Sequence, residues 1–278
     1  KALDYPPEIF PILAGAGSFH FIRSDYEKSK EIAEHSRQLA IEKSNPTGDL
    51  ICNRILGAVH FVTGNFDEAI KTLQIAIDIY DEDPQFHRSF APVYALDHKT
   101  TALCYLALAN ASIGNTDSAV KASTQAVEHS KTIDMHSSNC ALCYQAALLH
   151  IIGSPTKEIA RVSGKSLELA IAEGYPSWEG MSRIIKEEAD VQSGEAVDGM
   201  QEIEEGVFLH ESLGAQTFLP LAKSVQAKGY MATNQYKKAL DALTEAKRLS
   251  IKTQEYWYLP EILKLIAETL FQLNDYDV

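Results

Sequence analysis

The chain has 278 residues, a formal net charge of −13 and a pI near 5.1. An acidic chain repels the phosphates of nucleic acids and of anionic lipids, and no run of Lys and Arg offsets this repulsion, so neither nucleic acid nor a membrane is an expected partner. No apolar segment approaches the roughly 20 residues of a spanning helix, and four cysteines are too few for the disulfide framework of a secreted domain, so we expect a soluble, cytoplasmic protein.

Turn-forming residues recur along the chain in steps of 40, with a single step of 50 after the second. They are Ser24, Gly64, Gly114, Ser154, Gly194, Asn234 and Asn274. Gly and Asn tolerate positive φ, while Ser and Asn side chains can cap a helix, so each position predicts a turn between two helices. In chain order, the predicted helix pairs span 7–43, 48–81, 97–132, 136–173, 176–213 and 217–252, and a last helix lies near 258–273.

Small residues recur in phase with these turns. Twelve residues after each turn they are Ser36, Ala76, Ala126, Ser166, Gly206 and Ala246. Seven residues before each turn they are Gly17, Gly57, Ala107, Ala147, Ala227 and Ala267, with Glu187 as the exception. Helix backbones approach closely only where side chains are small, and one helix pair cannot bury its apolar face alone, so we expect neighbouring pairs to stack into a continuous core.

The unit containing Gly57, Gly64, Phe66, Ala69 and Ala76 resembles the tetratricopeptide repeat, in which small and aromatic residues occupy these places. The resemblance implies an all-α fold, namely a right-handed tetratricopeptide-like α-solenoid of about six helix pairs with a period of 40, plus a final helix. We expect a single superhelical domain over 1–278. Because 274–278 repeat the opening of a second helix, we also expect the chain to be a fragment of a longer protein.

The single step of 50 residues predicts an inserted loop over 82–96, between the second and third helix pairs. Insertions in solenoids lie in loops, and such loops often fall on the binding side. A packed connector without a functional role explains the insertion equally well.

Three stretches resemble the C-terminal helical region of bacterial class III adenylate/guanylate cyclases and of related multidomain ATPase regulators. They are 86–97, 104–109 and 114–120, together with 174–178 and 257–258. The resemblance implies a regulatory module of a larger signalling protein. The chain has neither a phosphate-binding Gly-x-x-x-x-Gly-Lys-Ser/Thr loop nor a cyclase pair of metal-binding aspartates, so any activity would belong to other domains.

Two patterns raise the question of a metal or redox site. Cys140 and Cys143 form a Cys-x-x-Cys pair, but they lie within a predicted helix without a second ligand pair, so we interpret them as core residues. His20, His60 and His150 share one repeat position, yet helices packed 8–10 Å apart hold equivalent residues too far apart to share a metal, and we expect hydrogen bonds between helices instead. We therefore predict no catalytic residue, metal or cofactor, and no enzymatic activity.

The predicted binding surface is the concave side, which first helices line in the repeats that the chain resembles. The residues predicted to contact a partner there are Arg54, Phe61, Tyr144, Leu148, Met181 and Ile184. Such aromatic, Met and Arg side chains suit a partner helix or peptide, whereas tight superhelical winding would bury the same residues as core. A reader of C-terminal carboxylates is not expected, because the positions of its paired Lys and Asn hold Arg54 with Ala58.

These observations predict a non-catalytic protein-protein interaction or regulatory module. Its partner would be a protein or peptide, including other domains of the same polypeptide. The alternative is a sensor domain that binds a peptide or small molecule in the concave channel.

Overall fold

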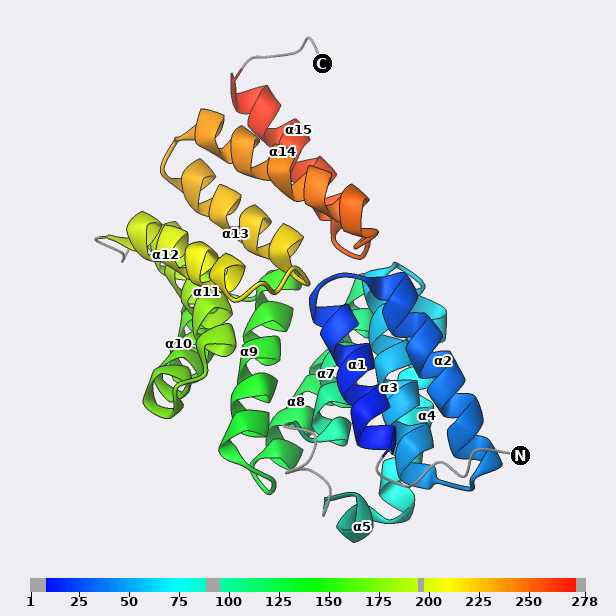
Figure 1. Cartoon of the computed structure of the whole chain (residues 1–278). Helices are drawn as coiled ribbons and strands as arrows, with labels where there is room; N and C mark the ends of the chain where they lie inside the picture. The colour runs from blue at the N-terminus through cyan, green and yellow to red at the C-terminus, as the bar shows by residue number, and fades with distance from the viewer. Residues whose placement is uncertain (1–8, 89–95, 195–197, 274–278) are drawn as a thin grey trace. The chain divides into compact units, whose positions relative to one another are not determined.

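The computed structural model describes residues 9–88, 96–194 and 198–273, which form helices and no strand. They divide into two compact units, Lys1–Ser138 and Asn139–Val278, coloured from blue to green and from green to red in Figure 1. The all-α prediction is confirmed. A single domain over 1–278 stays a prediction.

The described part of unit 1 contains three helix pairs and one short helix. They are α1 (Ile9–Ile22), α2 (Tyr26–Glu42), α3 (Pro46–Val62), α4 (Phe66–Glu82), α5 (Pro84–Arg88), α7 (His98–Ser112) and α8 (Thr116–Ser130). The pairs α1/α2, α3/α4 and α7/α8 lie within two residues of their predicted bounds. The short α5 falls inside the predicted loop, whose residues 89–95 lie outside the described ones.

Unit 2 contains the remaining helices, of which α9 begins just before the boundary. They are α9 (Met135–Ile151), α10 (Thr156–Glu173), α11 (Pro176–Ser193), α12 (Gly199–Ser212), α13 (Leu219–Ala232), α14 (Tyr236–Thr253) and α15 (Leu259–Leu273). Within the described ranges, no helix combines the length and apolarity needed to cross a membrane.

The predicted turns coincide with left-handed backbone at five of the six described positions. Their φ angles are 59° at Ser24, 83° at Gly64, 81° at Gly114, 75° at Gly194 and 58° at Asn234.

The fourth turn lies one residue earlier than the sequence predicts. Gly153, with φ of 70°, takes the left-handed conformation there instead of Ser154. Pro155 precedes α10 and lengthens this turn, so α10 begins three residues after the glycine, whereas α4 begins two residues after Gly64. Asn274 lies outside the described residues.

The phased small residues are points of close helix approach. A Cβ atom added to Gly57 would lie 2.5 Å from Leu73 Cγ across the α3/α4 pair. The residues twelve positions after the turns are all buried. Glu187 departs from the pattern because α11 meets α12 at Gly180 and Gly206, where an added Gly206 Cβ would lie 3.0 Å from the Gly180 carbonyl oxygen.

Candidate functional site

In unit 1, the two predicted partner-contact residues lie on the first helix α3. Phe61 is fully buried, and its ring lies 6.0 Å from that of Tyr105 on α7. Phe21 on α1 packs 5.9 Å from the same ring. Arg54 is half-buried and donates to Ser18 Oγ at 3.4 Å. Rings from three first helices therefore fill this face, and Phe61 is a core residue.

In unit 2, the other four predicted contact residues lie on α9 and α11. Leu148, Met181 and Ile184 are buried, and Tyr144 is half-buried. The Tyr144 ring lies 5.8 Å from that of Phe218 at the start of α13, two first helices further on. This burial fits the alternative in which winding places the residues in the core. Partner contact by the six predicted residues stays a prediction.

A buried polar contact links the same three first helices, α9, α11 and α13, near the C-terminal end of α9. His150 Nδ1 lies 3.2 Å from Glu188 Oε2 on α11, and Lys228 Nζ on α13 lies 3.5 Å from His150 Nε2. A neutral imidazole can donate to the carboxylate through Nδ1 and accept from the ammonium through Nε2. Hydrogen bonding between helices is thus found for His150, whereas His20 pairs with the neighbouring Asp25 at 2.9 Å.

The cysteine pair lies in the core of unit 2. Cys140 and Cys143 are both buried on α9, and neither forms a disulfide. Burial raises the pKa of Cys143 to about 12, which keeps this thiol protonated near neutral pH and unreactive. In the part of the chain that the structure describes, no three His, Cys, Asp or Glu side chains are grouped to hold a metal.

An open groove of about 620 Å³ lies in unit 1 on the side of the second helices. Its floor is α7, which packs against both α4 and α8, and those two helices form the walls. Apolar side chains in the groove, Ile77, Leu103 and Leu106, are largely buried. The polar residues that the groove offers to a ligand include Gln74, Asp81, Lys99, Asn110, Gln125 and His129.

The groove has two different ends. At one end, Lys99 at the start of α7 pairs with Asp81 near the end of α4, and Glu128 and His129 lie near the end of α8. At the other end lies Lys121, in the second turn of α8. The C-terminal ends of α4 and α8 therefore lie at this end of the groove. The partial negative charge of each helix dipole there adds to the charge of Asp81 and Glu128.

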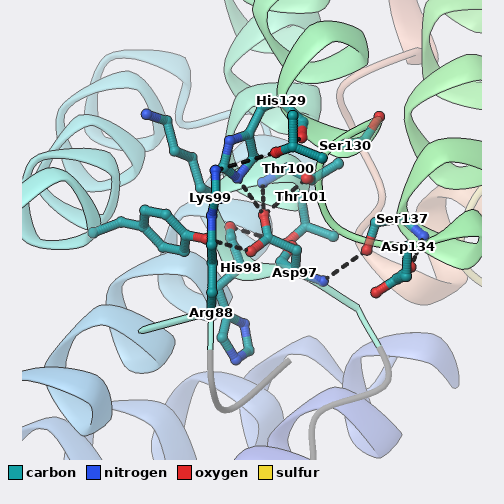
Figure 2. A network of polar contacts seen from close by, with 12 residues as sticks. Arg88, Asp97, His98, Lys99, Thr100, Thr101, His129, Ser130, Asp134 and Ser137 are labelled. Carbon is teal, nitrogen blue, oxygen red and sulfur yellow. Dashed lines mark hydrogen bonds and ion pairs between the residues drawn. The ribbon is translucent and has the colours of Figure 1, made fainter. Parts of the chain in front are cut away.

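A buried network around Asp97 holds this acidic end together (Figure 2). Asp97 is 1% exposed and caps α7 by accepting from the backbone N–H of Thr100 at 2.7 Å and from its hydroxyl at 2.8 Å. Tyr80 on α4 donates to the same carboxylate at 2.8 Å, and His129 on α8 pairs with it at 3.0 Å. The backbone N–H of Asp97 donates to Ser137 Oγ at 3.1 Å. One carboxylate thus ties α4, α7 and α8 together.

These contacts explain the charges of the network. Burial alone would raise the pKa of Asp97, but the hydrogen bond and charge of His129 and the donors of Thr100 outweigh it and lower that pKa to about 2. Burial and the charge of Asp97 raise the pKa of Tyr80, so its phenol remains a donor. Burial, aided by the charge of Arg54, lowers the pKa of His98 to about 3 and keeps that imidazole neutral.

The inserted segment packs onto this network. His87 of α5 is buried and stacks on Tyr80 with ring centres 5.6 Å apart, and its Nδ1 lies 3.3 Å from Thr47 Oγ1. Arg88 donates to Thr132 Oγ1 at 3.1 Å. The α5 part of the insertion is therefore a packed connector.

Sequence reasoning missed both the groove and the Asp97 network. The one local signal was an Asp directly before a helix with Thr three residues later, which predicts a cap. Tyr80 and His129 lie 17 and 32 residues from Asp97, and no periodicity relates them.

The arrangement of paired helices defines a tetratricopeptide-like α-solenoid, and comparison with solved structures supports this class. A Rap protein complexed with Competence and Sporulation Factor matches with a TM-score of 0.64 at 9% identity, covering 92% of this chain and 74% of that one. The Signal Transduction ATPase with Numerous Domains protein with a tetratricopeptide repeat sensor from Pyrococcus horikoshii matches with a TM-score of 0.54 at 18% identity. That match covers 92% of this chain and 36% of the other.

At these identities the likeness shows the fold alone. No protein-family model matches the chain, and no curated protein sequence matches it. The resemblance to class III cyclases stays a prediction.

Proposed function

We propose that this chain is a non-catalytic module that binds a protein or peptide, and that the groove of unit 1 takes part in this binding. The observation that carries the proposal is the groove itself, set in a fold whose first-helix faces are filled by their own side chains. On its α8 wall, the side chains of Gln125 and Lys121 form no hydrogen bond or ion pair with another described residue. Solvent-facing polar groups of this kind are available to a ligand.

A catalytic role for Asp97 and His129 has less support. The contact between Asp97 and His129 resembles the carboxylate and imidazole of an oriented base. However, the Asp97 carboxylate also accepts from the backbone N–H and hydroxyl of Thr100 and from Tyr80, so it has four donors in all. Among the described residues, no Ser or Cys side chain is bonded to His129. A nucleophile within reach of the base is what acyl transfer would require.

More specifically, we propose that the chain is a regulatory module of a larger signalling protein, of the cyclase or ATPase-regulator type. The sequence resemblance supports it, and so does the likeness in fold to a tetratricopeptide sensor in a signal-transduction ATPase. In such a protein, the partner would be another domain of the same polypeptide or a separate protein.

The alternative is a sensor that binds a peptide or small molecule. The matched Rap structure is complexed with Competence and Sporulation Factor, which favours a ligand-binding role for a solenoid of this kind. The groove volume also lies within the 300–1,000 Å³ range of ordinary ligand sites.

Thermal denaturation of the whole chain in the presence of peptide and metabolite panels tests both candidates. A ligand at a concentration 100 times its Kd stabilises the folded state by about 2.7 kcal/mol, which corresponds to a rise in Tm of roughly 5–10 °C for a chain of this size. Metabolite hits support the sensor, whereas peptide hits support peptide binding under either candidate. A chain that turns over substrate refutes the non-catalytic assignment.

A further inference from the structure

We propose that the groove of unit 1 binds an extended peptide segment of about five residues that carries a basic side chain at the Asp81 and Glu128 end. The inference rests on the proposed binding function and names the ligand class. It places the ligand on the second-helix side, opposite to the first-helix face that the sequence predicted.

The length of the groove sets the number of residues that an extended ligand can place in it. The lining stripes of α4, α7 and α8 run over 70–81, 99–110 and 118–129, which at 1.5 Å per residue corresponds to a length of about 16 Å. An extended chain rises about 3.3 Å per residue, so about five residues fit.

Amide side chains on all three helices suit an extended backbone. Gln74, Asn110 and Gln125 face the groove from α4, α7 and α8. Gln74 donates to Asp78 at 2.7 Å and Asn110 donates to the Leu106 carbonyl at 2.8 Å, which leaves their amide oxygens as acceptors. Gln125 has both its donor and its acceptor available. An extended peptide presents free N–H and C=O groups to such amides, whereas a helix consumes its own.

Charge sets the direction of the peptide. Asp81 and Glu128 are 48% and 66% exposed in their side chains, and they lie near the C-terminal, negative ends of α4 and α8. Lys99 pairs with Asp81, and Lys131 pairs with Glu128 at 2.6 Å, so each carboxylate already has one cation beside it. His129 is committed to Asp97. Exposed ion pairs of this kind contribute little to stability, so a basic ligand side chain can replace or join a lysine beside either carboxylate.

The opposite end prefers a negative group. Lys121 lies there, near the positive ends of the α4 and α8 dipoles. A peptide with its acidic residue or carboxyl terminus beside Lys121 and its basic residue beside Glu128 matches both ends. Exposed charges of this kind decide orientation and association rate more than affinity.

The test uses two display libraries selected on the whole chain, one of randomised linear heptapeptides and one of randomised faces on a helical scaffold. Binding of the enriched sequences is then measured for wild type, Gln125→Trp and Thr124→Trp. Gln125 lines the groove and Thr124 does not, although both are exposed on α8, so the second variant is a matched control. Glu128→Lys tests the charged end.

Linear peptides with a Lys or Arg near one end should be enriched. Their affinity should fall by about tenfold or more in Gln125→Trp and stay within about twofold in Thr124→Trp, and Glu128→Lys should weaken the basic peptides selectively. Binding that Gln125→Trp does not change overturns the inference and places the binding outside the groove, whereas groove binding by helical ligands alone overturns the extended ligand. In both cases the proposed binding of a protein or peptide stands. If neither library yields binders, the result counts against the proposed function itself.

Discussion

Replacing Asp97 with Ala should destabilise the fold by about 3–5 kcal/mol, the usual cost of removing one partner from a buried charged contact. The variant leaves Tyr80, Thr100 and His129 without the acceptor that each now uses. The lost helix cap accounts for about 1 kcal/mol of this cost, and the unsatisfied buried groups account for the rest. Asp97→Asn keeps the shape and one acceptor, so it should cost less than the Ala variant.

The measurement is urea unfolding followed by far-UV circular dichroism, combined with hydrogen exchange of the helices. Exchange should quicken most in α4, α7 and α8, because Asp97 joins these three helices. Asp25→Ala is the matched control. Asp25 also caps a helix, accepting from the Lys28 N–H at 3.3 Å, but its side chain is 52% exposed, so its loss should cost only about 0.5–2 kcal/mol.

Equal destabilisation by the two Ala variants would refute the reasoning, since Asp97 would then act as an ordinary cap. A double-mutant cycle with His129→Gln gives a second check. The pair lies 3.0 Å apart and is buried on the carboxylate side, so the two changes should be non-additive by about 0.5–3 kcal/mol. Additive costs would show that His129 contributes nothing to holding the carboxylate.

Three further predictions concern packing and protonation. Gly206→Ala should destabilise the chain by about 1–3 kcal/mol, because the added Cβ would lie 2.8 Å from Ile184 Cγ1, whereas Gly164→Ala on α10, with no neighbour nearer than 4.0 Å, should stabilise it by about 0.5–1 kcal/mol; a drop in Tm for both would contradict the packing argument. The pKa of His98 is lowered in the folded state, so the unfolded chain takes up a proton first as pH falls below about 6.5, and stability should decline by up to about 1.4 kcal/mol per pH unit toward pH 4.5. Urea midpoints across this range should fall less steeply in His98→Gln, and identical slopes would rule out His98 as a contributor. Cys143 should resist a thiol-modifying reagent until the chain unfolds, since burial raises its pKa to about 12, and rapid modification of the native chain at this residue, located by mass spectrometry, would show that the site opens.

The helix pairs could be predicted because their causes are local in sequence. A left-handed residue such as Gly64 ends one helix and allows the next to begin, and a small residue such as Gly57 meets Leu73 only 16 positions later. The misplaced turn at Gly153 has an equally local cause, which is the proline that follows it. Where the contacts that set a feature lie within one helix pair, periodicity reveals them.

The candidate site depended on contacts between pairs, which the sequence does not encode as a pattern. The same first-helix residues can line a channel or fill a core, and the rotation from one pair to the next decides which. In unit 2 this rotation brings Tyr144 to 5.8 Å from Phe218, 74 positions away, and buries Leu148 and Ile184.

The groove has the same dependence on tertiary structure. It exists because α4 and α8 flank α7 without closing over it, while Asp97 bonds to both walls through Tyr80 and His129. The sequence by itself therefore determined the helices and the way each pair meets, since neighbours in the chain make those contacts. Only the tertiary structure decided which face was filled and which stayed open, because that outcome depends on side chains brought together from distant repeats.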